Sequence, residues 1–257
     1  MMKIGCCTTI DRYDELVEIG YDAITLAGKD IVAMSDEEFE AAVEKMAAGP
    51  LVTSGVNTFC PPTVQFNGEA YDLAGVREYT EKLCERAKKL GIVALGVGAP
   101  NSRRIENGYP MDKGMAEFEE SLKTICAVAA EHDMEVMLEA LATVECNCIT
   151  TTTEALALVK KLGIDNLHLV YDIYHAFMMD ESPEVIREAI DEIRTVHISG
   201  YGDGKRPYLT MPEAEPLLPY IAVLKELGYD GEISVEAFYG DIHAGFVSTY
   251  EILKAAI

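Results

Sequence analysis

The chain has 257 residues, 49% of them hydrophobic, and its 44 acidic residues against 21 basic ones give a formal net charge of −23. This length and apolar content are sufficient for one large folded core. The electrostatic field of this net charge repels the phosphates of nucleic acid and the head groups of anionic lipid. We therefore expect neither nucleic acid nor an anionic membrane as a partner. The acidity is most simply explained by the solvated surface of Glu-rich helices.

From the sequence we expect neither a targeting segment nor a membrane span. Charged residues interrupt every apolar stretch well short of the roughly 18 residues that a membrane span needs, and the opening residues MMKIGCCTTI lack the long apolar core of a secretory signal. The seven cysteines then indicate a reducing compartment, where they act as small apolar residues or free thiols. We therefore expect a cytoplasmic protein.

Short β-rich runs alternate with longer amphipathic runs along the whole chain, without a Ser/Pro-rich linker or a low-complexity segment. The expected strands cover residues 2–7, 22–26, 51–57, 92–97, 134–139, 167–172, 193–198 and 232–237. The expected helices cover residues 11–20, 35–48, 71–91, 112–132, 151–163, 182–190, 211–228 and 243–256. Several of these helices open on Asp, Ser or Thr and close on Gly, as helix caps require.

Eight strand–helix pairs average about 32 residues each, which is close to one βαβ repeat, and the total matches the roughly 250 residues of a typical (β/α)8 barrel. We therefore predict an α/β fold, a TIM barrel that forms a single domain over residues 1–257. An open doubly wound sheet is the alternative if the chain has fewer strands than this pattern indicates.

The candidate functional residues lie at the ends of the last four expected strands. Side chains in a closed barrel alternate between the helix layer and the interior, and functional groups lie at the carboxyl ends of the strands. With the apolar residues facing the helices, Glu139, Asp172, His197 and Glu236 all fall on inward positions, at intervals of 33, 25 and 39 residues that fit one repeat each. We expect these four side chains to converge.

Three carboxylates held together repel one another and need a compensating positive charge. A divalent cation supplies that charge, so we predict one metal ion between the four residues. One nitrogen and three carboxylate ligands suit Mn, Mg or Co better than a tetrahedral structural zinc, although zinc remains possible. Taken singly, each of these residues has a simpler explanation, as a solvated loop glutamate or a hydrogen-bonded core histidine.

Four segments of the sequence resemble the xylose isomerase-like barrels, which include sugar phosphate isomerases and epimerases and, more distantly, endonuclease IV. They are LEAL with Glu139, VYDIYHAF with Asp172 and His175, VHISG with His197, and VEAF with Glu236. The resemblance spans the chain and is not specific for a substrate. It implies that Glu139, Asp172, His197 and Glu236 bind one divalent metal, with His175 and Glu145 facing the substrate.

Three further positions are compared with the same family. The segment GVGAPNSRRIENGYP resembles the family's loop with paired arginines, so Arg103 or Arg104 is a candidate to hold a distal hydroxyl, carboxylate or phosphate of the substrate. Thr25 stands where many relatives carry a Glu, and Asp203 stands where relatives often have a substrate-binding Arg. Arg206 takes over that role if its loop is longer here.

A mechanism follows if a hydroxyketone binds the metal through its carbonyl and hydroxyl oxygens. The cation then stabilises the metal-bound enediolate that forms when the proton between these groups leaves, and Glu139 and Glu236 remove and return that proton. Return on the opposite face gives an epimer, and return on the neighbouring carbon gives an isomer. The predicted function is a divalent-metal-dependent sugar or sugar phosphate isomerase or epimerase of carbohydrate metabolism.

Three rival functions share parts of this pattern. A nuclease of the endonuclease IV type uses several zinc ions and many histidines, whereas no His precedes His132 here and the net charge opposes DNA. A dehydratase of a keto-polyol would use the same metal and base, and nothing in the sequence separates it from an epimerase. A non-catalytic sugar-binding barrel is the third. The expected partner in each enzymatic case is a small sugar or polyol, and a homo-oligomer is compatible with the sequence.

Overall fold

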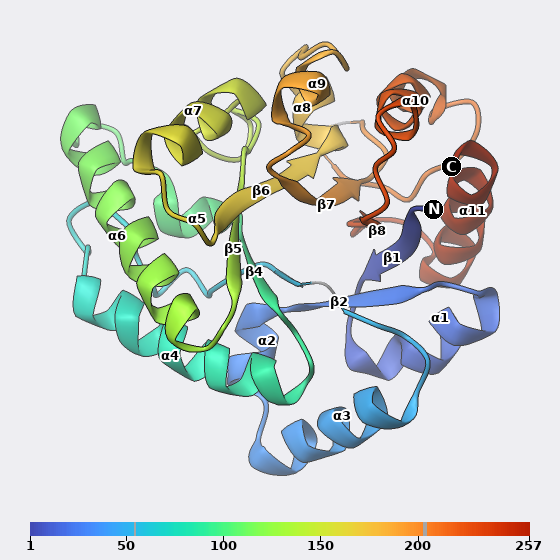
Figure 1. The fold of residues 1–257 in the computed structure, drawn as a ribbon, viewed down its shortest axis with the longest axis horizontal. Coiled ribbons are helices and arrows are strands. Elements are labelled where there is room, and N and C mark those ends of the chain that lie inside the picture. Colours follow the sequence, from blue (N-terminus) through green and yellow to red (C-terminus); the bar gives the residue numbers. More distant parts are fainter. Residues whose placement is uncertain (54, 203–204) are drawn as a thin grey trace.

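The computed structural model describes residues 1–53, 55–202 and 205–257, and its parallel strands close into a barrel in the order β1 to β8, with β1 paired to β8 (Figure 1). The strands are β1 (Lys3–Cys7), β2 (Ala23–Ala27), β3 (Val56–Asn57), β4 (Ala94–Val97), β5 (Glu135–Glu139), β6 (Leu167–Asp172), β7 (Ile193–Ile198) and β8 (Glu232–Val235). The prediction of a TIM barrel is confirmed.

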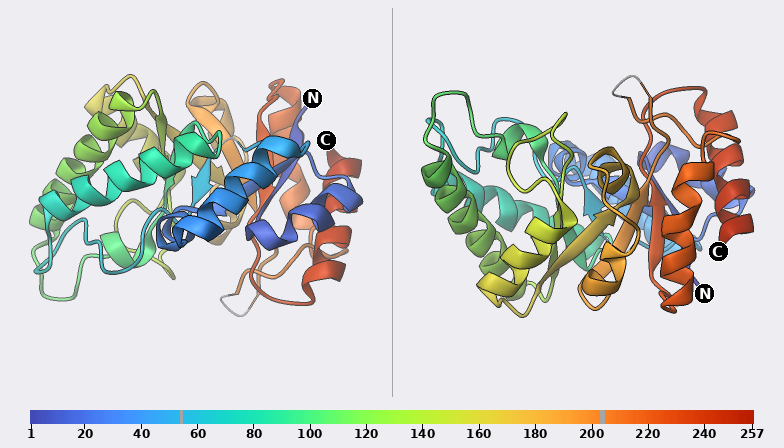
Figure 2. Two further views of the ribbon diagram at one scale, coloured as in Figure 1. Left: turned by 90° about the horizontal axis from the view of Figure 1, so that it is seen from below. Right: turned by 90° about the horizontal axis from the view of Figure 1, so that it is seen from above.

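The helices surround this barrel, and both chain termini lie on the same side of it in every view (Figures 1 and 2). They are α1 (Tyr13–Ile19), α2 (Gly28–Ala33), α3 (Asp36–Ala48), α4 (Leu73–Lys89), α5 (Pro100–Arg103), α6 (Met111–Glu131), α7 (Thr152–Leu162), α8 (Ile173–Met178), α9 (Val185–Ala189), α10 (Leu218–Glu226) and α11 (Ile242–Ala256), with short 3₁₀ turns at Ile10–Arg12 and Glu215–Leu217. Among the helices that the structure describes, none has the length and apolar character needed to cross a membrane.

Local sequence signals explain where several helices begin and end. Ser35 forms a capping box with Glu38 at the start of α3, and the side chain of Thr151 accepts a hydrogen bond from the Glu154 amide at the start of α7. Gly163 then ends α7 in the left-handed conformation, with φ 56°, which a glycine adopts without steric cost. These caps satisfy backbone groups that a helix end otherwise leaves unpaired.

The observed elements differ from the expected ones mainly at the strand ends. The third strand is reduced to Val56–Asn57, and the eighth ends at Val235. The short helices α2, α5 and α8 were not expected, and they follow the carboxyl ends of β2, β4 and β6. The helix expected from residue 211 begins as α10 at Leu218, and Pro219 lies in its first turn, where the missing N–H costs nothing.

The barrel interior confirms the alternation of side chains on which the site prediction rests. Met137 of β5 and Val170 of β6 form a small buried cluster with Ala94, separate from the core between strands and helices. Each lies two residues before the last residue of its strand, and therefore on the same face. Glu139 and Asp172 consequently point into the barrel mouth.

Candidate functional site

Four acidic and histidine side chains meet at the carboxyl ends of β5 to β8. Glu139 and Asp172 are the last residues of their strands, His197 is the penultimate residue of β7, and Glu236 directly follows β8. One ligand atom from each lies within 4.8 Å of the others, and the four residues are only 2–7% exposed. The structure therefore brings together the set that the sequence predicted to converge.

His197 lies between the two glutamates. Its Nδ1 is 3.3 Å from Oε1 of Glu139 and 3.4 Å from Oε2 of Glu236. Its Nε2 faces the other way, 4.0 Å from Sγ of Cys7 at the end of β1. The imidazole thus turns one nitrogen toward the carboxylates and the other toward the end of β1, two strands away in the barrel.

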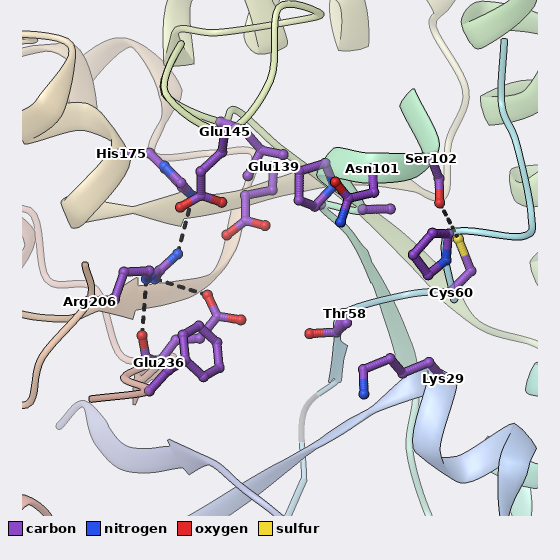
Figure 3. Close-up of a pocket in the computed structure, with 16 residues that line it drawn as sticks. Lys29, Thr58, Cys60, Asn101, Ser102, Glu139, Glu145, His175, Arg206 and Glu236 are labelled. Carbon is purple, nitrogen blue, oxygen red and sulfur yellow. Dashed lines mark hydrogen bonds and ion pairs between the residues drawn. The ribbon is translucent and has the colours of Figure 1, made fainter. Parts of the chain in front are cut away.

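Arg206 is the cation that contacts this cluster most closely. Its Nη2 donates to Oδ2 of Asp172 at 2.5 Å and lies 2.9 Å from Oε2 of Glu236. Its Nε donates to the Glu236 carbonyl at 3.1 Å and to the Ser199 hydroxyl at 3.2 Å. These contacts fix a nearly fully buried guanidinium among the carboxylates (Figure 3).

The environment moves the pKa values of the carboxylates apart. Burial raises the pKa of Glu139 to about 7, against the opposing effect of His197. Burial acts in the same direction on Asp172 and Glu236, but Arg206 and the neighbouring histidines together outweigh it and hold the pKa of both below its ordinary value. The cluster therefore contains carboxylates whose charge is already compensated and one whose charge is not.

These residues fit a divalent metal ion. They offer three carboxylate groups and one imidazole nitrogen, with all ligand atoms close enough to share one cation. Arg206 supplies one positive charge against three buried carboxylates, which leaves negative charge that a dication would neutralise. Oxygen-rich sets of this kind suit Mn, Mg or Co, and zinc also binds carboxylate and imidazole.

A pocket of about 240 Å³ opens above the cluster and is lined by Glu139, Glu236, Arg206, His175 and Glu145. Figure 3 shows His175 and Glu145 on the same side of the pocket as Arg206. The backbone N–H of Ala142 donates to Nδ1 of His175 at 3.1 Å, and burial lowers the pKa of this histidine to about 4. His175 is therefore a neutral ring, with Nε2 as its second polar atom.

The two arginines of the loop after β4 lie elsewhere. Arg103 is fully buried beside Phe118, and its Nη2 donates to the Glu139 carbonyl at 2.7 Å, so it lies behind the pocket wall rather than in it. The reason is that α5 turns its side chain toward β5. Arg104 donates to the Glu145 carbonyl at 2.5 Å and lines a separate cavity.

The two departures from the family pattern have different outcomes. Thr25 is buried inside the barrel, where its hydroxyl donates to Oε1 of Glu232 at 3.0 Å, and it does not line the pocket. Arg206 lines the pocket, and its contact with a substrate stays a prediction. Asp203 lies outside the described residues.

Other residues of the site gave no clear signal in the sequence. Asn57, the last residue of β3, donates to Oε1 of Glu236 at 2.7 Å and orients that carboxylate. Its place at an expected strand end was a usable clue. Lys29, Thr58 and Asn101 also line the pocket, and Figure 3 shows Lys29 and Thr58 across it from His175 and Glu145. Of the three, only Asn101 falls in a segment with family resemblance, the loop after β4.

Comparison with known proteins shows the family. The family model described as "Xylose isomerase-like TIM barrel" matches residues 13–256. D-psicose 3-epimerase of Agrobacterium fabrum is 24% identical over 235 residues, which cover 88% of this chain and 78% of that protein. Inosose isomerase of Halalkalibacterium halodurans is 28% identical over 143 residues, about half of each chain.

Solved structures share the fold. D-allulose 3-epimerase from Methylomonas sp. superposes with a TM-score of 0.84 at 17% identity, covering 100% of this chain and 98% of that one. The IolI protein, whose structure holds a zinc atom, gives a TM-score of 0.76 at 19% identity, with 99% and 98% of the two chains covered. The match of the family model shows that the chain belongs to the xylose isomerase-like TIM barrel family.

Proposed function

We propose that the protein is a divalent-metal-dependent isomerase or epimerase that moves a proton next to the carbonyl of a sugar or keto-polyol. The observation that carries the proposal is the convergence of Glu139, Asp172, His197 and Glu236, two of which, Glu139 and Glu236, line an open pocket. The names of the matched relatives, D-psicose 3-epimerase and inosose isomerase, agree with this chemistry. The zinc in the IolI structure agrees with a metal site.

In this proposal the four clustered residues hold the ion. When bound, a divalent ion supplies Lewis acidity, which stabilises the negative charge that develops on the substrate oxygens. Glu139 comes from β5 and Glu236 from the end of β8, so the two carboxylates approach the substrate from different parts of the barrel wall. One removes the proton from carbon and the other returns it, through an enediolate.

The remaining polar groups orient the substrate. Nε2 of His175 and the Arg206 guanidinium lie 3.2 Å apart and both line the pocket, so together they can bind adjacent substrate oxygens. Glu145 lines the same pocket, where its carboxyl oxygens can accept a hydrogen bond from a substrate hydroxyl. These contacts fix which C–H faces Glu139 or Glu236.

Solvent exchange tests the proposed chemistry. The Mn-loaded protein is incubated in D2O with ketoses, their phosphates and inososes, and NMR follows deuterium at carbon together with the products. Deuterium in an epimer or aldose supports the proposal, and elimination of water would instead identify a dehydratase. If no substrate gains deuterium but sugars still bind, the protein is a sugar-binding barrel.

Metal content tests the ligand set separately. His197→Ala is expected to lose bound metal on elemental analysis while keeping the circular dichroism of the folded barrel. His132→Ala is the matched control, because His132 pairs with Glu81 far from the cluster. Equal metal content in the two variants would refute the assignment.

A further inference from the structure

A second cavity, of about 370 Å³, adjoins the pocket at the barrel mouth. The two share three lining residues, Lys29, Thr58 and Phe238, and are therefore neighbours across this wall. Figure 3 shows Lys29 and Thr58 on the side of the pocket that lies across from Glu145 and His175. A molecule bound over the acidic cluster can extend past these residues into the second cavity.

The second cavity also lies next to the side chains of the proposed proton-transfer site. Cys7 lines it and lies 4.0 Å from Nε2 of His197. Asn57 lines it as well and holds Oε1 of Glu236 at 2.7 Å. The cavity is thus close enough to the proposed proton-transfer groups for one substrate to occupy both spaces.

Its charged residues balance one another. Asp11, Arg12, Lys29 and Asp30 line the cavity, two acids and two bases. Nη1 of Arg12 pairs with Glu15 at 3.1 Å, and Nζ of Lys29 pairs with Asp30 at 2.8 Å. A phosphate placed here would compete with carboxylates for cations that are already paired, whereas hydroxyl groups can both donate to the acids and accept from the bases.

The uncharged residues that line the second cavity also suit an uncharged, hydroxyl-rich ligand. Thr8 and Thr9 add hydroxyl groups, and Tyr208 and Phe238 add aromatic faces. Phe238 is 59% exposed although it is a large apolar side chain at the entrance of both cavities. A sugar ring has an apolar face of C–H groups and a rim of hydroxyls, which matches aromatic faces beside paired charges.

We propose that this cavity is a subsite for a second, uncharged sugar unit, so that the substrate is a keto-glycoside or a ketose-containing disaccharide. The reacting unit lies over Glu139 and Glu236, and its glycosidic partner lies against Arg12, Asp30 and Tyr208. This inference rests on the proposed isomerase or epimerase function for its catalytic part, but binding in the second cavity can be measured without turnover.

The catalytic test compares D-fructose with glucosyl-fructoses linked through C4, C5 or C6, using deuterium incorporation from D2O and kcat/KM. At least one disaccharide is expected to exceed fructose by about tenfold, which corresponds to one or two additional hydrogen bonds. Arg12→Ala and Tyr208→Ala should each lower the ratio of the two kcat/KM values about tenfold. Arg77→Ala, an exposed position on α4, is the control and should leave the ratio unchanged.

The binding test uses methyl α-D-glucoside as a probe of the second unit alone, followed by saturation-transfer NMR on the metal-free protein. The signal should be present in the wild type and in Arg77→Ala, and lost in Arg12→Ala. Turnover of fructose with no gain for any disaccharide would overturn the subsite, as would a preference for fructose 6-phosphate. A glucoside signal without turnover of any ketose would keep the subsite and refute the proposed enzymatic function.

Discussion

Replacing Arg206 by Met removes the guanidinium and keeps most of the side-chain length. In the metal-free protein this leaves Asp172 and Glu236 buried without the contacts at 2.5 and 2.9 Å that now compensate their charge. Breaking a buried ion pair by removing one partner typically costs about 3–5 kcal/mol. Because two carboxylates share this arginine, we expect a loss of unfolding free energy in that range.

A bound dication changes the expected cost, because it compensates the same carboxylates. Urea unfolding is therefore measured in EDTA and again in saturating Mn²⁺, and the destabilisation by Arg206→Met should be clearly smaller with the metal present. An equal loss in both conditions would mean that the arginine contributes packing rather than charge.

Arg187→Met is the matched control. Arg187 also pairs with two carboxylates, at 2.7 Å from Glu184 and 2.7 Å from Glu226, but these groups lie at the surface. Surface pairs contribute little because water and salt screen them. If Arg206→Met destabilises the metal-free protein no more than this control does, the electrostatic reasoning about the site is wrong.

Three other predictions concern the glutamates. Glu139→Gln and Glu236→Gln should each lower turnover about 10²- to 10⁴-fold, because an amide cannot accept the proton; full activity in both would make them ligands only. Burial raises the pKa of Glu139 to about 7, so below that pH a proton must leave on metal binding. Burial lowers the pKa of His197, but the acidic groups around it raise that pKa above its ordinary value, so this ligand also releases a proton. Calorimetry should therefore show Mn²⁺ affinity falling at least about tenfold per pH unit below pH 7, against a flat profile if no proton is released. Gly98→Ala places a Cβ against Oε2 of Glu139 and should weaken Mn²⁺ binding in paramagnetic resonance titrations.

Side-chain alternation was enough to predict the acidic cluster from the sequence. The positions of Glu139 and Asp172 follow from the apolar residues that precede them, because neighbouring residues of a strand face opposite sides. Glu236 lies one residue beyond β8, yet its N–H still donates to the Ile198 carbonyl at 2.9 Å, so the strand conformation continues through it. The alternation of apolar and polar residues therefore predicts the direction of side chains wherever the backbone is extended.

The loops could not be predicted in the same way. Ala99 adopts a left-handed conformation with φ 47°, which starts α5 and turns Arg103 away from the pocket toward the Glu139 carbonyl. Alanine carries no signal for that conformation. The family resemblance made Arg206 a candidate to bind the substrate, but its place among the carboxylates was not predicted, because no periodicity governs a loop. Lys29 could not be identified as a pocket residue from the sequence, because only the closed barrel brings it to the pocket.

The balance of charge at the barrel mouth explains why a strongly acidic protein can hold this site together. Three carboxylates of the cluster face Arg206 and, in our proposal, a dication, so the positive and negative charges there are equal in number. Burial raises the pKa of Glu145 and so disfavours a further negative charge beside them. The second cavity again pairs two acids with two bases. Since neither space offers surplus positive charge and the whole chain carries −23, the field favours an uncharged sugar over a phosphorylated one.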